Sequence, residues 1–222
     1  MPSIFSEQLF SQQVVLITGG SRGGMLKETA RQFLLHGAQA VVLMSRSKDK
    51  NEAVCASLRP HGTCVSMPGD VSKAEECQKV AKEVVAQFGR IDVLVNGAAG
   101  NFLATAERLS AGGMRRVLEI DTIGTFNMSQ AVFKTSMKAR RQGVIINVSA
   151  CLHWNGTFAQ AHSAAAKAGV DALTKVLATE WGPFNVRVVG IVPGYIEGTE
   201  GFERLGDLNN LNNKQATEQA FS

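Results

Sequence analysis

The chain has 222 residues, of which 45% are hydrophobic and 19% are charged, and its formal net charge is +4. This length suits one well-buried domain, and nothing in the sequence indicates a second, so residues 1–222 are interpreted as a single domain. The basic residues are scattered, which argues against a nucleic-acid partner and suits a phosphate-bearing cofactor and substrate. No apolar run reaches the roughly 18 residues that a membrane span needs. The cysteines lack C-x-x-C spacing and are expected to be free thiols.

A phosphate-binding turn is expected near the start of the chain. Residues 14–17 form a short, continuously apolar run, which is typical of a parallel strand buried on both faces. A glycine-rich turn follows, and then a helical pattern that ends at Gly37. In this arrangement bare backbone lets a pyrophosphate approach N–H groups at the positive end of the helix dipole. The predicted cofactor-binding residues of the turn are Thr18, Gly19, Gly20, Ser21, Arg22, Gly23 and Gly24.

This turn resembles the Thr-Gly-x-x-x-Gly-x-Gly turn of the short-chain dehydrogenase/reductase family, with a departure. The glycines fall in different places when counted from the threonine and from the end of the helix, so the turn holds one extra residue. In either count the third glycine is replaced by Met25 or Leu26. That glycine permits close packing of helix on strand. A bulkier residue is therefore expected to push the helix outward or to reshape the turn.

The second strand, residues 40–44, ends at Ser45 and Arg46. Enzymes that prefer NAD usually place a carboxylate here to bind the ribose hydroxyl, whereas Ser-Arg suits the 2′-phosphate of NADP. Arg22 in the glycine-rich turn supports the same interpretation. The alternative is two solvated surface arginines. We expect NADPH to be the cofactor.

The ends of the next two strands extend the family resemblance. A third strand at residues 64–67 ends in Gly-Asp-Val, and in the resembled family this aspartate contacts the adenine amino group. A helix at residues 75–88 leads to a fourth strand at residues 91–95. The Asn-Gly-Ala-Ala-Gly that follows is close to the family's Asn-Asn-Ala-Gly, which supports the cofactor ribose. The resemblance therefore implies four more cofactor-binding residues, Asp70, Val71, Asn96 and Ala98.

The helix after the fifth strand departs from the family's catalytic pattern. Residues 144–149 read as the strand, and the family's next helix carries Tyr-x-x-x-Lys, in which the tyrosine supplies the proton that accompanies hydride transfer. Here Lys167 is present, but Ser163 stands in place of the tyrosine and Ala150 in place of the usual catalytic serine. The chain thus keeps the lysine that holds the cofactor and lacks the other two residues.

Four separated stretches narrow the resemblance to the 2,4-dienoyl-CoA reductases, particularly their peroxisomal branch. They are residues 98–103, 119–127, 180–188 and 193–206. This resemblance implies NADPH-dependent reduction of 2,4-dienoyl-CoA thioesters in β-oxidation of unsaturated fatty acids, by a homotetramer located in the peroxisome. The alternatives are another acyl-CoA or carbonyl reductase, such as a trans-2-enoyl-CoA reductase, a catalytically silent NADP-binding protein, and a cytoplasmic location.

The chemistry of a dienoyl thioester makes the missing tyrosine intelligible. Reduction places a hydride at one end of the conjugated system and a proton at the other, with enolate-like charge on the thioester oxygen between them. The resemblance implies that a carboxylate and an ordered water provide the proton. These catalytic roles fall on Asp121, where most family members carry an asparagine, and on Lys167. The alternative for Asp121 is a solvated or capping residue on a helix.

The resemblance also implies a set of substrate contacts. Phe102 and Ser110 lie in segments that border the acyl-CoA in the resembled enzymes, and Arg204 matches a basic residue that meets the CoA moiety. Ser149 is a candidate donor to the thioester oxygen, or a strand-end serine with a local polar partner. The residues expected to complete the cofactor site after the sixth strand are Pro193, Gly194 and Ile196.

The order of these elements predicts a Rossmann-type, doubly wound α/β domain. We expect a mostly parallel sheet with helices on both faces and strand order 3-2-1-4-5-6. Family members continue beyond this length, so the C-terminal part of the usual domain is expected to be missing and residues 186–192 to form a sheet edge. No spacing of histidines, cysteines or paired carboxylates suggests a metal. His153 and His162 are expected to pack or to form hydrogen bonds.

Overall fold

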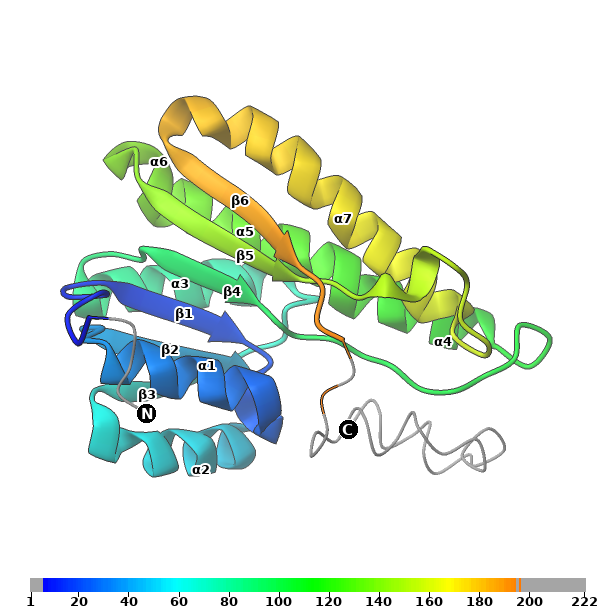
Figure 1. The fold of residues 1–222 in the computed structure, drawn as a ribbon, viewed down its shortest axis with the longest axis horizontal. Helices are drawn as coiled ribbons and strands as arrows, with labels where there is room; N and C mark the ends of the chain where they lie inside the picture. The colour runs from blue at the N-terminus through cyan, green and yellow to red at the C-terminus, as the bar shows by residue number, and fades with distance from the viewer. Residues whose placement is uncertain (1–5, 195, 197–222) are drawn as a thin grey trace.

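The computed structural model describes residues 6–194 and residue 196 (Figure 1). Its centre is a six-stranded parallel sheet with the order β3-β2-β1-β4-β5-β6, which confirms the predicted topology. The strands are β1 (Val14–Thr18), β2 (Ala40–Ser45), β3 (Cys64–Pro68), β4 (Val93–Asn96), β5 (Gly143–Val148) and β6 (Val186–Ile191).

Helices cover both faces of the sheet (Figure 1). On one face lie α1 (Gly24–Leu35) and α2 (Lys48–Leu58). The other face carries α3 (Ala74–Phe88), α5 (Gly124–Val132) and α7 (Ala161–Trp181). Two short helices, α4 (Ala111–Leu118) and α6 (Lys138–Arg140), adjoin α5 through the π-helical turns Glu119–Ile123 and Phe133–Met137. No helix in the described part of the chain is long and apolar enough to cross a membrane.

Alternate residues of the central strands build two separate cores. All five residues of β1 are buried, because the strand has neighbours on both sides and helices on both faces. Val14 and Leu16 pack into the core beneath α3, α5 and α7, whereas Val15 and Ile17 pack into the core beneath α1 and α2. The continuous apolar runs in the sequence thus mark strands that are buried on both faces.

The turn after β1 places a bulky side chain against the end of β4. A 3-10 turn, Gly20–Arg22, precedes α1. Leu26 then lies over Gly97, so that a Cβ atom on Gly97 would come within 2.6 Å of the leucine side chain. The bulk at the position of the missing third glycine is accommodated because residue 97, at the end of β4, has no side chain of its own.

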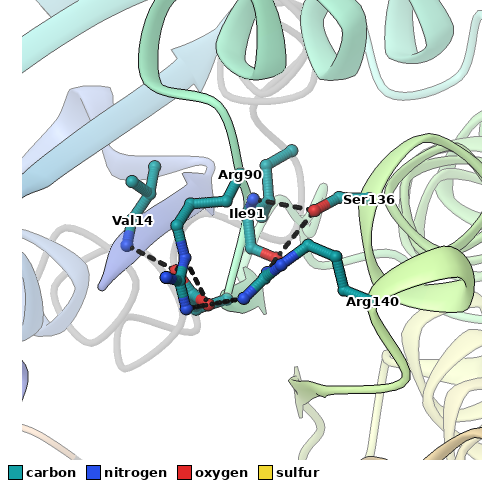
Figure 2. A network of polar contacts seen from close by, with 6 residues as sticks. Val14, Arg90, Ile91, Ser136 and Arg140 are labelled. Carbon is teal, nitrogen blue, oxygen red and sulfur yellow. Dashed lines mark hydrogen bonds and ion pairs between the residues drawn. The ribbon is translucent and has the colours of Figure 1, made fainter. Parts of the chain in front are cut away.

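A polar network fixes the opposite, amino-terminal ends of β1 and β4 (Figure 2). The carboxylate of Asp92, which is 5% exposed, accepts a 2.9 Å hydrogen bond from the Val14 backbone N–H. It also forms ion pairs with Arg90 and, at 2.9 Å, with Arg140. Ser136 donates to and accepts from the backbone of the neighbouring residue 91. The network joins the sheet to the segment around α6.

The last described strand, β6, lies at an edge of the described sheet, as expected. Val186 and Val188 are buried against α7, but Val189 is 44% exposed and Ile191 is 42% exposed. Both side chains lie on the sheet face that α1 and α2 cover. Those two helices pack on other strands of the sheet. Arg204 lies outside the described residues.

Candidate active site

Most of the predicted site residues lie at the carboxyl ends of the strands, where the crevice of a doubly wound sheet forms. The Thr18 hydroxyl oxygen accepts 3.2 Å hydrogen bonds from the N–H groups of Gly97 and Ala98, which ties the end of β1 to the end of β4. Gly19 has a φ of +86°, and a Cβ atom there would lie 2.6 Å from Ala98. A side chain at residue 19 would therefore clash, which explains this glycine.

The glycine-rich turn leaves backbone open to a ligand. Gly23 has a φ of +75°, and a Cβ atom built on it would meet none of the described atoms within 4 Å. Gly24 begins α1, whose first N–H groups have no partner within the helix. Gly20, by contrast, is backed by Leu43, and Ser21 is partly buried. Open backbone beside a helix start fits the pyrophosphate of a dinucleotide.

Ser45 and Arg46 close β2 beside the end of β3. The Ser45 hydroxyl donates to the Ser47 carbonyl at 3.3 Å, and the Ser45 carbonyl accepts from the Gly69 N–H at 3.0 Å. Arg46 is exposed. The chain at the end of β2 reads Ser-Arg-Ser and carries no carboxylate, and the predicted preference for NADPH rests on this.

Asp70 is held in a defined orientation after β3. One carboxylate oxygen accepts from the Ser72 N–H and hydroxyl at 2.9 and 2.7 Å, and the other pairs with Arg116 at 3.2 Å. Burial would raise the pKa of Asp70, but the hydrogen bonds from Ser72 and Arg116 outweigh it and the pKa is lowered. Val71 is a core residue, 7% exposed, packed on Gly124. Its side chain is thus directed away from the crevice.

Asn96 is a buried member of a polar network that sequence reasoning missed. Its Nδ2 donates to Ser129 at 2.9 Å and to Asn147 at 2.8 Å, and Asn147 donates to Thr174 at 2.9 Å. The Oδ1 atom of Asn96 is buried without a partner among the described residues. The only sequence signal for this network was two asparagines within apolar strands.

Asp121 and Lys167 form a buried ion pair at the centre of the site. Lys167 Nζ lies 3.1 Å from Asp121 Oδ2 and donates to the Val148 carbonyl at 3.0 Å. The Gly100 N–H donates to Asp121 Oδ1 at 2.8 Å. Asp121 is 1% exposed and Lys167 is 7% exposed. The interpretation of Asp121 as a solvated surface residue is therefore wrong.

Burial is the largest influence on the pKa of Asp121. It raises the pKa of Asp121, and the Lys167 ammonium and the Gly100 N–H oppose the rise without cancelling it. A carboxyl group with a raised pKa next to a cation is a candidate for proton transfer.

The local backbone explains how the pair forms. Asp121 lies in the π-helical turn Glu119–Ile123, a feature that often marks functional sites. The Thr122 hydroxyl donates to the Ala166 carbonyl at 2.9 Å, and a Cβ atom on Gly169 would come within 2.8 Å of the Thr122 side chain. The absence of a side chain at residue 169 lets this turn approach α7 closely, which brings Asp121 to Lys167.

Two serines lie near the pair. Ser163, in the place of the family tyrosine, is 2% exposed on α7. Ser149 follows β5, and its backbone N–H pairs with the Ile191 carbonyl at 2.8 Å. Its hydroxyl is buried without a hydrogen-bond partner among the described residues. The described residues thus give this hydroxyl no local polar partner, and the donor role toward a thioester stays a prediction.

Phe102 and Ser110 converge on Gly113, at the start of α4. The Ser110 hydroxyl oxygen caps the helix by accepting the Gly113 N–H at 3.0 Å. A Cβ atom on Gly113 would lie 3.0 Å from the Phe102 ring. That ring stacks on His162, with centroids 4.2 Å apart. Burial lowers the pKa of His162 against a smaller opposing effect of the Phe102 backbone, so His162 packs as a neutral ring, as expected.

The other predicted positions are His153 and the residues that follow β6. His153 forms a 3.1 Å contact with Asp171, in line with the expected hydrogen bonding. Pro193, Gly194 and Ile196 follow β6 at the same edge of the sheet as the other strand ends. The side chain of Arg22, like the whole of Arg204, lies outside what the structure describes. The described residues contain no cluster of three metal-ligating side chains, and their four cysteines are free.

Comparison with known proteins places this site in a family. A family model described as short chain dehydrogenase matches residues 13–209. An Arabidopsis thaliana protein named as a peroxisomal 2,4-dienoyl-CoA reductase that produces (3E)-enoyl-CoA is 44% identical over 214 residues, which cover 92% of this chain and 71% of the relative. A Danio rerio protein of the same name is 40% identical, with 91% of this chain and 67% of the relative covered.

A solved structure shows the same architecture. An NAD+-bound xylitol dehydrogenase superimposes with a TM-score of 0.85 at 29% identity, covering 90% of this chain and 76% of that protein. The fold, the open glycine-rich turn and the buried lysine are thus found together in a chain that resembles known oxidoreductases.

Proposed function

The chain belongs to the short chain dehydrogenase family, and from this premise we propose that it is an NADPH-dependent 2,4-dienoyl-CoA reductase. It is an oxidoreductase with a nicotinamide cofactor. The relatives named as peroxisomal 2,4-dienoyl-CoA reductases support the substrate. The observation that carries the proposal is the buried Asp121–Lys167 pair in a site whose family tyrosine is replaced by a serine.

The crevice residues fit the cofactor. The turn around Gly19 and Gly23 would hold the pyrophosphate. Lys167 has three N–H donors, of which two are committed to Val148 and Asp121, so one remains for a ribose hydroxyl. Serine and arginine at positions 45 and 46, without a carboxylate, support NADPH over NADH.

The chemistry follows from what each residue can donate. Bound NADPH supplies the hydride to the far end of the diene. The negative charge that develops on the thioester oxygen needs a donor, and the Ser149 hydroxyl, which has no hydrogen-bond partner among the described residues, is the candidate. Asp121 then delivers a proton, through a water molecule, to the carbon next to the thioester. Burial raises the pKa of this carboxyl, which favours its protonated form relative to an exposed aspartate.

The proposal includes location and assembly. The named relatives are peroxisomal, which supports a peroxisomal enzyme. Assembly as a homotetramer is supported by apolar side chains exposed on neighbouring helical elements. Ile123 is 47% exposed, Phe126 is 37% exposed and Val176 is 51% exposed. Large contiguous apolar patches are typical of surfaces that bind another protein chain, and these three side chains are the proposed members of such a patch.

The test is NADPH consumption by the purified protein with three thioesters: a 2,4-dienoyl-CoA, a saturated 3-oxoacyl-CoA and a trans-2-enoyl-CoA. We expect oxidation with the dienoyl ester alone. Oxidation with the enoyl or oxoacyl ester instead would assign another reductase activity. Binding of NADPH without turnover of any of the three would identify a catalytically silent protein, an alternative that the absent tyrosine raises.

A further inference from the structure

Two segments that are distant in sequence meet beside the catalytic pair. The loop after β4 contacts the start of α7 in three ways. The Asn101 side-chain amide donates to Gln160 Oε1 at 2.6 Å, the Ala104 N–H donates to the Ala159 carbonyl at 3.0 Å, and the Phe102 ring stacks on His162. The loop is thus fastened to α7 by side chains as well as by backbone.

The orientation of the two amides is determined by the backbone. Asn101 Oδ1 accepts a 2.8 Å hydrogen bond from the Phe102 N–H, which can only donate. Asn101 must therefore turn its NH₂ group toward Gln160, and Gln160 must present its oxygen. Gln160 is 5% exposed and precedes the first turn of α7, yet its side chain makes no capping hydrogen bond to that helix. Its oxygen is committed to Asn101.

Asn101 directly follows Gly100, whose backbone N–H is hydrogen-bonded to the carboxylate of Asp121. The Gly100 N–H donates to Asp121 Oδ1, so any movement of this loop changes that 2.8 Å contact. We propose that Gln160 is a positioning residue, which acts through Asn101 to hold the Gly100 N–H against Asp121. The inference rests on the proposed function, because Asp121 matters to catalysis only if it moves a proton.

The electrostatics of Asp121 give this role a measurable signature. Among the described residues, the carboxylate is influenced by one charge, the Lys167 ammonium on α7, and by one backbone donor, the Gly100 N–H. Both favour the ionised form against burial. If the Gly100 N–H moves away, burial is opposed by Lys167 alone, and the pKa of Asp121 rises further.

The test uses Gln160→Met, which keeps the approximate shape of the side chain and removes the acceptor oxygen. Two readouts need no turnover: hydrogen exchange of the Gly100 amide, and the pKa of Asp121 from a carboxyl NMR titration assigned with Asp121→Asn. We expect exchange roughly tenfold faster, as for the loss of about one hydrogen bond, and a higher pKa. With the dienoyl thioester, kcat should fall roughly 10- to 100-fold with little change in KM.

Matched variants separate positioning from general damage. Gln87→Met changes an exposed glutamine on α3 and should leave all readouts unchanged. Gln160→Glu keeps an acceptor oxygen and should restore slow exchange at Gly100. If Gln160→Met does not fold, Asn101→Ala removes the same contact from the other side and must give the same faster exchange.

Unchanged Gly100 exchange together with an unchanged Asp121 pKa, in a folded Gln160→Met protein, would overturn the inference. Failure of the wild-type protein to reduce the dienoyl ester would instead contradict the proposed function. In that case the exchange and titration results still decide whether Gln160 positions Gly100.

Discussion

In the proposed mechanism, a single carboxylate at residue 121 supplies the proton that the family's tyrosine would otherwise provide. The ordinary pKa of an aspartate is about 3.9, which would leave too little of the protonated form near neutral pH. Burial raises the pKa of Asp121, whereas Lys167 and the Gly100 N–H lower it and so make the rise smaller. The same lysine that would hold the cofactor ribose therefore also lowers the pKa of the proposed proton donor.

The proposed preference for NADPH also depends on a single residue, Arg46. Arg46→Ala removes the cation proposed to meet the 2′-phosphate, and a charge-assisted hydrogen bond contributes about 1.5–3 kcal/mol. We expect KM for NADPH to rise roughly 10- to 100-fold, with KM for NADH nearly constant. Steady-state kinetics with both cofactors measure this, with Arg31→Ala, on α1, as a control. An equal loss with both cofactors would show that Arg46 does not recognise the phosphate.

Among the elements, the π-helical turn Glu119–Ile123 and α7 do most to shape the site. The turn presents Asp121, α7 presents Lys167, and Gly169 allows the two to approach. The strands were predictable because each is a short, mainly apolar run, and the glycine-rich turn was predictable from its composition. The π-helical turn was not, since nothing in the local sequence distinguishes it from a regular helix. The Asn101–Gln160 pair was missed because it joins residues 59 positions apart.

The polar network at the amino-terminal end of β4 should control stability rather than chemistry (Figure 2). Burial would raise the pKa of Asp92, but the hydrogen bonds from Arg90, Val14 and Arg140 outweigh it, so the pKa is lowered. A lowered pKa contributes stability that is complete above the unfolded-state pKa of about 3.9 and is lost as the pH falls through the folded-state value.

We therefore expect Asp92→Asn to lower the free energy of unfolding by about 2–3 kcal/mol at neutral pH. The expected loss does not exceed the cost of breaking a fully buried ion pair, because the side chains of Arg90 and Arg140 are partly exposed. Urea unfolding at several pH values measures it. The difference from wild type should shrink below about pH 4, and a difference that does not depend on pH would show that the ion pairs contribute little.

At the scale of the whole molecule, the family fold and the order of all six strands followed from the sequence. The pattern of parallel strands and covering helices leaves few other topologies. Surfaces are less predictable, because an exposed apolar residue in a helix has the same sequence pattern as a buried one. Ile123 and Phe126 became visible as a surface feature only in the structure.

The proposed tetramer gives a prediction at this scale. Light scattering should give a mass about four times the 23.7 kDa of the chain. Phe126→Arg, which places a charge in the exposed apolar surface, should shift the protein to smaller species, whereas Leu9→Arg, at another exposed apolar residue, should not. A monomeric wild-type protein, or a tetramer unaffected by Phe126→Arg, would contradict the role of this surface.

The most direct test of the account is single-turnover reduction of a 2,4-dienoyl-CoA by Asp121→Asn, with NADPH bound. Asparagine keeps an oxygen for the Gly100 N–H but cannot supply a proton, and general acid catalysis typically contributes roughly 10²–10⁴-fold. We expect the rate to fall by at least roughly 100-fold while NADPH still binds, with Glu75→Gln on α3 as the control. An Asp121→Asn protein that reduces the dienoyl ester at the wild-type rate would show that this carboxylate is not the proton donor.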